Sequence, residues 1–132
     1  MNKTSVKLTF TNDFVGTVHA AHGEIPINQD GQSLLPYDML LGALGSCFYA
    51  TFLDIARKMR LEYDRAEIDV VGVKREETPT HLVTADMLFT IYGAKEEKGF
   101  QRAAELAAKY CSIHYTLSQV ADIQLKLQFK DA

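Results

Sequence analysis

The sequence has little cysteine, no long apolar run and no excess of positive charge, and each absence narrows the range of functions. Two of the 132 residues are cysteine, and the net charge at pH 7 is −3. General nucleic-acid binders carry a basic patch, whereas acidic and basic residues are mixed along this chain, so neither a nucleic-acid partner nor a polybasic membrane tail is expected. No apolar run reaches the roughly 18 residues of a membrane-spanning helix. The N-terminal residues alternate instead of forming the apolar block of a signal peptide. We therefore expect a cytoplasmic protein with no membrane partner.

The two cysteines, Cys47 and Cys111, are far apart in the sequence and form no Cys-x-x-Cys motif. Thiols are mostly kept reduced in the cytoplasm, so a permanent disulfide is not expected. With 47% hydrophobic residues, the chain can bury a core without a disulfide or a metal ion. On these grounds alone, the favoured interpretation is that both cysteines are small buried hydrophobic residues.

A zinc site is the alternative use of these side chains. It would combine Cys111 and His114 with the distant His19 and His22, and this spacing matches no compact zinc motif. We therefore expect no metal and no cofactor. His114 follows Cys111 by three positions, where a protonated imidazole would favour a thiolate, although an ordinary surface histidine is the simpler interpretation.

Residues 34–60 predict one long helix that carries Cys47 near its middle. Ser33 and Pro36 suit its start, and Asp38 in the first turn complements the positive end of the helix dipole. Small residues around Gly42 and Gly45 make this part of the helix thin, which predicts close approach of another backbone beside Cys47. The apolar residues at helical spacing predict a core stripe of Leu41, Leu44, Phe48, Phe52, Ile55 and Met59.

Strand patterns come before and after this helix. Alternation of apolar and polar residues predicts strands over residues 5–10, 14–21, 24–27, 68–73, 82–91 and 121–129. A second helix is predicted over 95–110, with a shorter helix or turn over 112–119. The order of elements predicts a single α+β domain over residues 1–132, with largely antiparallel sheets and helices on one face.

Two segments of the chain resemble the cysteine motifs of the OsmC/Ohr family. Residues 36–47 (PYDMLLGALGSC) are similar to that family's first-cysteine helix, commonly written Pro-x-Glu-Leu-Leu-Leu-Ala-Ala-Leu-Gly-x-Cys. Residues 107–113 (AAKYCSI), with Thr116-Leu117-Ser118, are similar to its second-cysteine segment. Residues 56–60 (ARKMR) further resemble an OsmC-like branch of uncharacterised proteins. The predicted order of elements also matches over nearly the whole chain.

The resemblance implies an OsmC-like fold with a long central helix carrying Cys47, in a domain-swapped homodimer. It also implies an enzyme, a thiol peroxidase that acts on organic hydroperoxides or hydrogen peroxide. In that activity Cys47 would be the peroxidatic cysteine and Cys111 the resolving one, since a nearby second thiol converts a sulfenic acid to a disulfide. A cellular dithiol or a thioredoxin-like protein would then be the reductant.

The sequence departs from the family pattern around the expected thiolate. Better-known members hold it with an arginine from the N-terminal strands, oriented by a glutamate before the first cysteine. The first arginine here is Arg57, about 15 Å along the helix from Cys47 and too far to reach the cysteine of its own chain, which leaves an arginine from a partner subunit as the alternative. Asp38 matches the glutamate of the uncharacterised branch and is included among the expected catalytic residues, with a simple first-turn charge as the alternative. Ser112 replaces the usual proline.

These departures leave two other functions open. The same fold without catalysis would be a small-molecule-binding or redox-sensing dimer, with Gly42 and Gly45 opening an apolar pocket. A structural protein with two inert core cysteines is the third interpretation.

Overall fold

The computed structural model describes residues 2–31 and 34–132, and its contacts divide the chain into two compact units, Met1–Leu40 and Leu41–Ala132. Each unit is described by itself. Ser33, expected at the start of the long helix, lies outside the described residues. The expectation of one domain over the whole chain stays a prediction.

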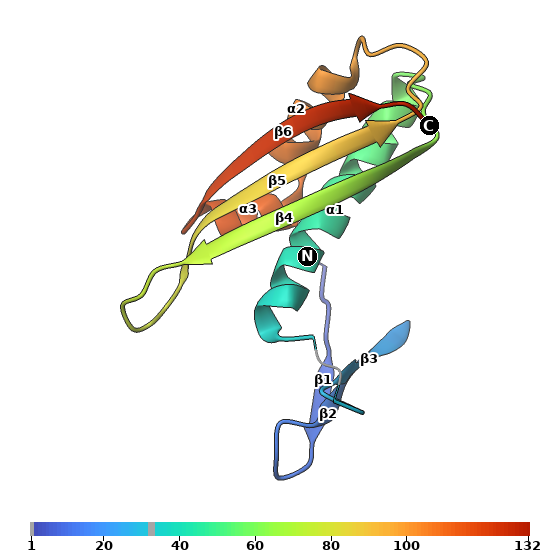
Figure 1. The fold of residues 1–132 in the computed structure, drawn as a ribbon. Helices are drawn as coiled ribbons and strands as arrows, with labels where there is room; N and C mark the ends of the chain where they lie inside the picture. The colour runs from blue at the N-terminus through green and yellow to red at the C-terminus, as the bar shows by residue number, and fades with distance from the viewer. Residues whose placement is uncertain (1, 32–33) are drawn as a thin grey trace. The chain divides into compact units, whose positions relative to one another are not determined.

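The first unit contains a three-stranded antiparallel sheet in the order β1-β2-β3 (Figure 1). Its strands are β1 (Lys7–Phe10), β2 (Gly16–Ala20) and β3 (Gly23–Ile27). Leu8 pairs with Val18, which pairs with Ile25, so one face is apolar, because side chains alternate along a strand. The adjacent set of paired residues, Lys7, His19 and Glu24, places polar side chains on the other face. The predicted turn at Asp30 and Gly31 is present, and both residues have positive φ.

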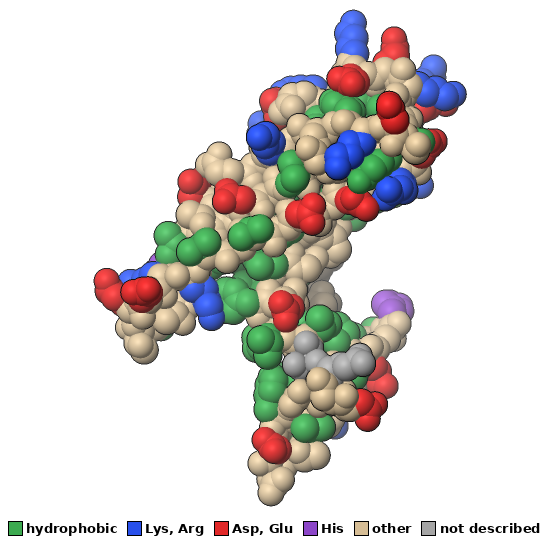
Figure 2. Space-filling model, viewed as in Figure 1, with side chains coloured by type: hydrophobic (Ala, Val, Ile, Leu, Met, Phe, Trp, Pro, Cys, Tyr) green, Lys and Arg blue, Asp and Glu red, His purple; other side chains and the backbone are tan. Residues whose placement is uncertain are grey.

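The second unit is a sheet of three long strands with helices on one face (Figure 1). The strands are β4 (Arg65–Lys74), β5 (Leu82–Tyr92) and β6 (Asp122–Lys130). The helices are α1 (Pro36–Lys58), whose first residues belong to the first unit, α2 (Phe100–Tyr110) and α3 (Ser112–Ser118). The α+β class and the helix carrying Cys47 are thus confirmed. On the strands, Figure 2 shows acidic and basic side chains interspersed.

One pairing corrects the expectation of antiparallel sheets. β4 and β5 are antiparallel, but β5 and β6 are parallel, with Met87 opposite Leu125. The physical reason is the connection: a short hairpin joins antiparallel strands, whereas α2 and α3 carry the chain back across the sheet before β6 begins, as a parallel pair requires.

The core of the second unit is a cluster of aromatic rings between α1 and the sheet. Phe52 of α1 lies 4.7 Å, ring centre to ring centre, from Phe89 of β5, and Phe48 lies 5.2 Å from the same ring. Phe100 of α2 extends the cluster to Phe129 of β6 at 5.6 Å. These edge-to-face contacts are the favoured aromatic geometry, and they hold α1 firmly on the sheet.

α1 passes the length and composition test for a membrane-spanning helix, which contradicts the expectation that no segment would. Leu44, Phe48 and Phe52 are nevertheless fully buried in the protein. Because these side chains contact the sheet and α2 rather than lipid, α1 is the core helix of its unit.

Two helix boundaries also differ from the sequence prediction. Met59, expected in the core stripe, is 38% exposed, while Ala56 is buried in its place, since α1 ends at Lys58 and Arg60 turns the chain with φ 58°. The predicted helix over 95–110 begins only at Phe100. Gly99 precedes it with φ 91°, a left-handed conformation that interrupts a helix and favours glycine.

Candidate functional site

Cys47 lies in the middle of α1, at the edge of its buried face. Its neighbour Phe48 is fully buried, whereas Cys47 itself is half-buried. The Thr51 hydroxyl donates a hydrogen bond to the Cys47 carbonyl oxygen at 3.0 Å, so it does not hold the sulfur. The side chain therefore combines a rigid helical backbone with partial access to solvent.

Cys111 lies at the junction of α2 and α3, where the chain leaves the helical conformation for one residue with φ −70° and ψ 119°. Its backbone N–H still donates to the Ala107 carbonyl at 2.9 Å, which ends α2. Its sulfur accepts a hydrogen bond from the His114 backbone N–H at 3.4 Å, which caps α3. The side chain is fully buried.

The fold brings the two cysteines together, and both are free thiols. Burial raises the pKa of the Cys111 thiol, the His114 backbone N–H opposes this rise, and the adjacent Cys47 thiol adds to it. Cys111 is therefore held in the protonated form more strongly than an ordinary thiol. Since the thiolate is the reactive species, Cys111 is the weaker first nucleophile of the pair.

The environment of His114 favours the neutral imidazole over the cation suggested by its position. Burial lowers the pKa of its half-buried imidazole, which favours the neutral ring at pH 7. Its contact with Cys111 is made by the backbone N–H and not by the ring. The effect of this residue on the sulfur is thus independent of the side chain.

Asp38 contacts the start of its own helix. The Asp38 carboxylate accepts a hydrogen bond from the Leu35 backbone N–H at 2.8 Å. This is the carboxylate half of a capping box, in which a third-position side chain satisfies an N–H with no helical partner. The first-turn role considered from the sequence is therefore present.

Among the described residues, no arginine is hydrogen-bonded or ion-paired to Cys47. Arg57 lies near the hydroxyl of Tyr63, where its charge opposes an upward shift in the tyrosine pKa. Burial and a 2.6 Å hydrogen bond to the Tyr49 hydroxyl cause that shift. Sequence reasoning missed this tyrosine pair because only the tertiary structure brings α1 next to the segment before β4.

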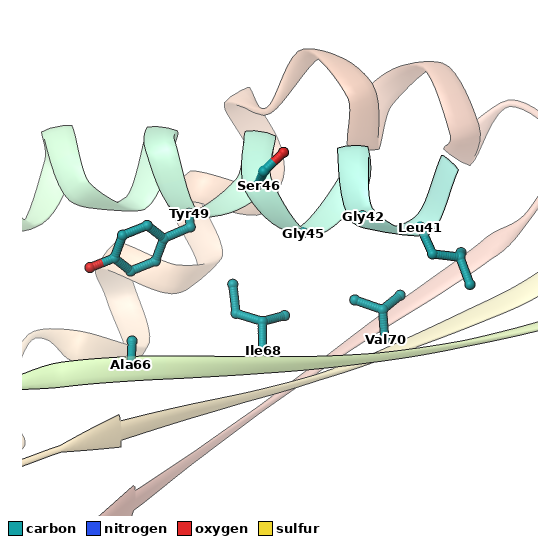
Figure 3. A pocket seen from close by; sticks show the side chains of 8 residues that line it. All are labelled: Leu41, Gly42, Gly45, Ser46, Tyr49, Ala66, Ile68 and Val70. Atoms are coloured by element: carbon teal, nitrogen blue, oxygen red, sulfur yellow. The ribbon is translucent and has the colours of Figure 1, made fainter. Parts of the chain in front are cut away.

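The small residues of α1 face β4 and line an open groove of about 300 Å³ (Figure 3). Gly42, Gly45 and Tyr49 form the helix side of the groove, and Ile68 and Val70 point into it from β4. This placement corrects the expectation for the two glycines: at 100° per residue, Gly45 and Cys47 point about 160° apart around the helix. The glycines therefore face the sheet and not the side of the helix that carries Cys47.

No three His, Cys, Asp or Glu side chains within residues 2–31 and 34–132 lie close enough together to hold a metal ion. In the first unit, His19 is instead hydrogen-bonded to Thr9 and Glu24.

The fold is thus α+β with two free thiols side by side. One thiol lies on the long core helix and the other at the junction of two helices. The family model described as OsmC-like protein matches residues 29–126, and the chain belongs to this family. Protein YhfA of Escherichia coli K12 is 28% identical over 98 residues, which are 73% of each chain.

Solved structures agree on the fold. A hypothetical protein from Aquifex aeolicus VF5 is 25% identical with a TM-score of 0.89, over 100% of this chain and 99% of that one. An organic hydroperoxide resistance protein OsmC from Legionella pneumophila is 12% identical with a TM-score of 0.74, over 97% and 98%. The OsmC-like fold expected from the two cysteine motifs is confirmed.

Proposed function

We propose that this chain is a thiol-dependent peroxidase that reduces organic hydroperoxides or hydrogen peroxide. The observation that carries the proposal is the contact between the half-buried Cys47 thiol and the fully buried Cys111 thiol. Hydroperoxide resistance in the name of a structural relative is consistent with it. The proposed setting is the cytoplasm, with a dithiol or thioredoxin-like protein as the reductant.

In the proposed reaction, the Cys47 thiolate attacks one oxygen of the peroxide O–O bond. The bond breaks, an alcohol or water leaves with a proton, and Cys47 becomes a sulfenic acid. The Cys111 sulfur then attacks the Cys47 sulfur, water leaves, and a disulfide forms. An external dithiol reduces the disulfide and is itself oxidised. Cys47 acts first because it is more accessible and because the pKa of Cys111 is raised.

The proposed active form is a homodimer in which the N-terminal strands are exchanged. On the first unit, Leu8, Phe10 and Ile25 are 39–48% exposed, and Figure 2 shows hydrophobic side chains at its surface. A three-stranded sheet is stable only when its apolar face is covered. A second copy of the chain is the occupant that the family resemblance implies, and sedimentation equilibrium tests the stoichiometry.

The catalytic assignment is tested with one equivalent of an organic hydroperoxide. Mass spectrometry should show a Cys47–Cys111 disulfide in the unmodified chain. The Cys111→Ser variant should instead accumulate a Cys47 sulfenic acid that a dimedone probe traps, and Cys47→Ser should consume no peroxide. Peroxide consumption by Cys47→Ser at the unmodified rate would refute the proposal.

The catalytic role of Asp38 stays a prediction, and the Asp38→Asn variant tests it. A catalytic carboxylate predicts slower disulfide formation at unchanged helix content, measured by circular dichroism. An unchanged rate would leave Asp38 with only the hydrogen bond to Leu35 described above.

A second candidate function, a small-molecule-binding or redox-sensing dimer, is favoured by the groove along Gly42 and Gly45. Native mass spectrometry of freshly purified protein would show a bound ligand. A Gly42→Val variant, whose side chain would enter the groove, should then lose the ligand while its thiols are unchanged. Peroxide consumption decides between this function and the peroxidase.

A further inference from the structure

A line of three hydrogen-bonded side chains crosses the polar face of the β1-β2-β3 sheet. Thr9 Oγ1 lies 2.9 Å from His19 Nε2, and His19 Nδ1 is hydrogen-bonded to Glu24 Oε2. The strand register fixes this arrangement: His19 is directly opposite Glu24, and Thr9 is paired with Thr17, two positions before His19. One strand each thus contributes a hydroxyl, an imidazole and a carboxylate.

The contacts suit one tautomer of His19, in which Nδ1 carries the hydrogen. An ionised carboxylate only accepts hydrogen bonds, so in this tautomer Nδ1 donates to Glu24. Nε2 of the neutral ring then has a free lone pair that can accept the Thr9 hydroxyl hydrogen. In that tautomer the Thr9 hydroxyl lies against a base that is oriented by a third group, as an activated nucleophile requires.

The three side chains are also accessible. Thr9 is exposed, and the side chains of His19 and Glu24 are 37% and 62% exposed. Lys7 is paired with His19 and lies two residues before Thr9 on the same face, so it adds a positive charge there. A shallow cavity of about 610 Å³ adjoins the Glu24 end of this line; Ser5 and His22 line it as well, and Thr9 and His19 do not.

We propose that this face is an acyl-transfer site for small activated carboxylic esters, with Thr9 as nucleophile, His19 as general base and Glu24 as positioning residue. The site uses none of the groups assigned to the peroxidase. The strand register places one cation, Lys7, on this face and no fixed pair of donors for a developing oxyanion, which restricts the substrates to esters with a good leaving group.

The reaction balances without a redox partner. Thr9 Oγ attacks the ester carbonyl carbon while its proton moves to His19 Nε2. The bond to the leaving oxygen breaks, and His19 returns the proton to the leaving alcohol, which gives an acyl ester on Thr9. Water then attacks that ester with the same base, releases a carboxylic acid and restores the Thr9 hydroxyl.

The test uses p-nitrophenyl acetate and the full chain with Cys47→Ser and Cys111→Ser, so that no thiol consumes the ester. Peptide mass spectrometry should find one acetyl group on Thr9. His19→Asn should lower the rate of Thr9 acetylation by about 100-fold, the low end of a general-base effect. Glu24→Gln should lower the maximal rate without changing the ester concentration that gives half of it.

A matched control lies on the same sheet. Thr17 carries the same side chain but accepts from Gln29 instead of a histidine, so Thr17→Val should not change acetylation at Thr9. Thr9→Ser should retain acetylation at position 9. Thr9→Val, which lacks the hydroxyl, should lose acetylation at position 9. Comparing Thr9→Ser with Thr9→Val decides the outcome even if circular dichroism shows that His19→Asn fails to fold.

Two results would overturn the proposal. One is an equal rate of p-nitrophenol release by the parent chain, which carries Cys47→Ser and Cys111→Ser, and by its Thr9→Val variant. The other is acetylation of lysines and the N-terminus but not of Thr9. In either case the line only holds the three strands in register. Because the parent lacks both thiols, these outcomes leave the peroxidase proposal untouched.

Discussion

Iodoacetamide should alkylate Cys47 in the folded chain long before it alkylates Cys111. Alkylation requires a thiolate with access to solvent. Cys47 is half-buried, whereas Cys111 is fully buried and has a raised pKa. Cys111 therefore reacts only after the α2–α3 junction opens. Local opening in a packed core costs a few kcal/mol, and about 3 kcal/mol corresponds to a rate at least about 100-fold lower.

The assay is peptide mass spectrometry on samples quenched over time, without peroxide and under reducing conditions. In concentrated urea the two cysteines should react at rates within about threefold, because unfolding removes the protection of the buried side chain. A Cys47→Ala variant shows whether slow labelling of Cys111 depends on its neighbour. Labelling of both cysteines at equal rates in the folded chain would refute the assignment of Cys47 as the accessible thiol.

Three further predictions follow from the second unit. Phe52→Ala should lower the free energy of unfolding in urea by about 3–5 kcal/mol, because the deleted ring is fully buried; Leu53→Ala, at a half-buried neighbour, should cost less. The free energy of unfolding should fall as pH rises above about 8.5, because the folded chain holds the Cys111 proton more tightly than the unfolded chain. The loss continues until the pH passes the raised pKa of Cys111. In urea titrations at pH 7.5 and 9.5, Cys111→Ala should show a smaller fall in the free energy of unfolding between the two pH values. His114→Gln should form the Cys47–Cys111 disulfide at a rate within about twofold of the unmodified chain, because Gln keeps the backbone N–H that contacts the sulfur; a rate lower by about tenfold would restore a role for the imidazole.

The sequence predicts the elements well where periodicity is strong. Phe48 and Phe52 recur at helical spacing and lie in the core as expected, and the alternation over 82–91 is a strand in the structure. Prediction fails where one residue overrides the local pattern. Gly99 delays the second helix because of its left-handed backbone, and Met59 leaves the core because the helix has already ended.

Tertiary features were less accessible from the sequence. Alternation shows that residues 121–129 form a strand but does not show its direction, which depends on where α2 and α3 return the chain. The proximity of Cys47 and Cys111 could be expected only through the motif resemblance, since spacing alone does not bring two distant residues together. The hydrogen bond between Tyr49 and Tyr63 has no sequence signal at all.

The glycines of α1 illustrate why composition alone misleads. Their presence beside Cys47 predicted close approach of another backbone, because each costs roughly 1 kcal/mol of helix stability relative to alanine. In the structure, a Cβ built at Gly45 would meet Val70 at 3.6 Å, an ordinary contact, and one at Gly42 would meet nothing within 4 Å. Packing inside this unit therefore does not require either glycine. Their effect is to leave the groove open, on the face of the helix turned away from Cys47, so an occupant of the groove and the chemistry of the thiols can be tested separately on one helix.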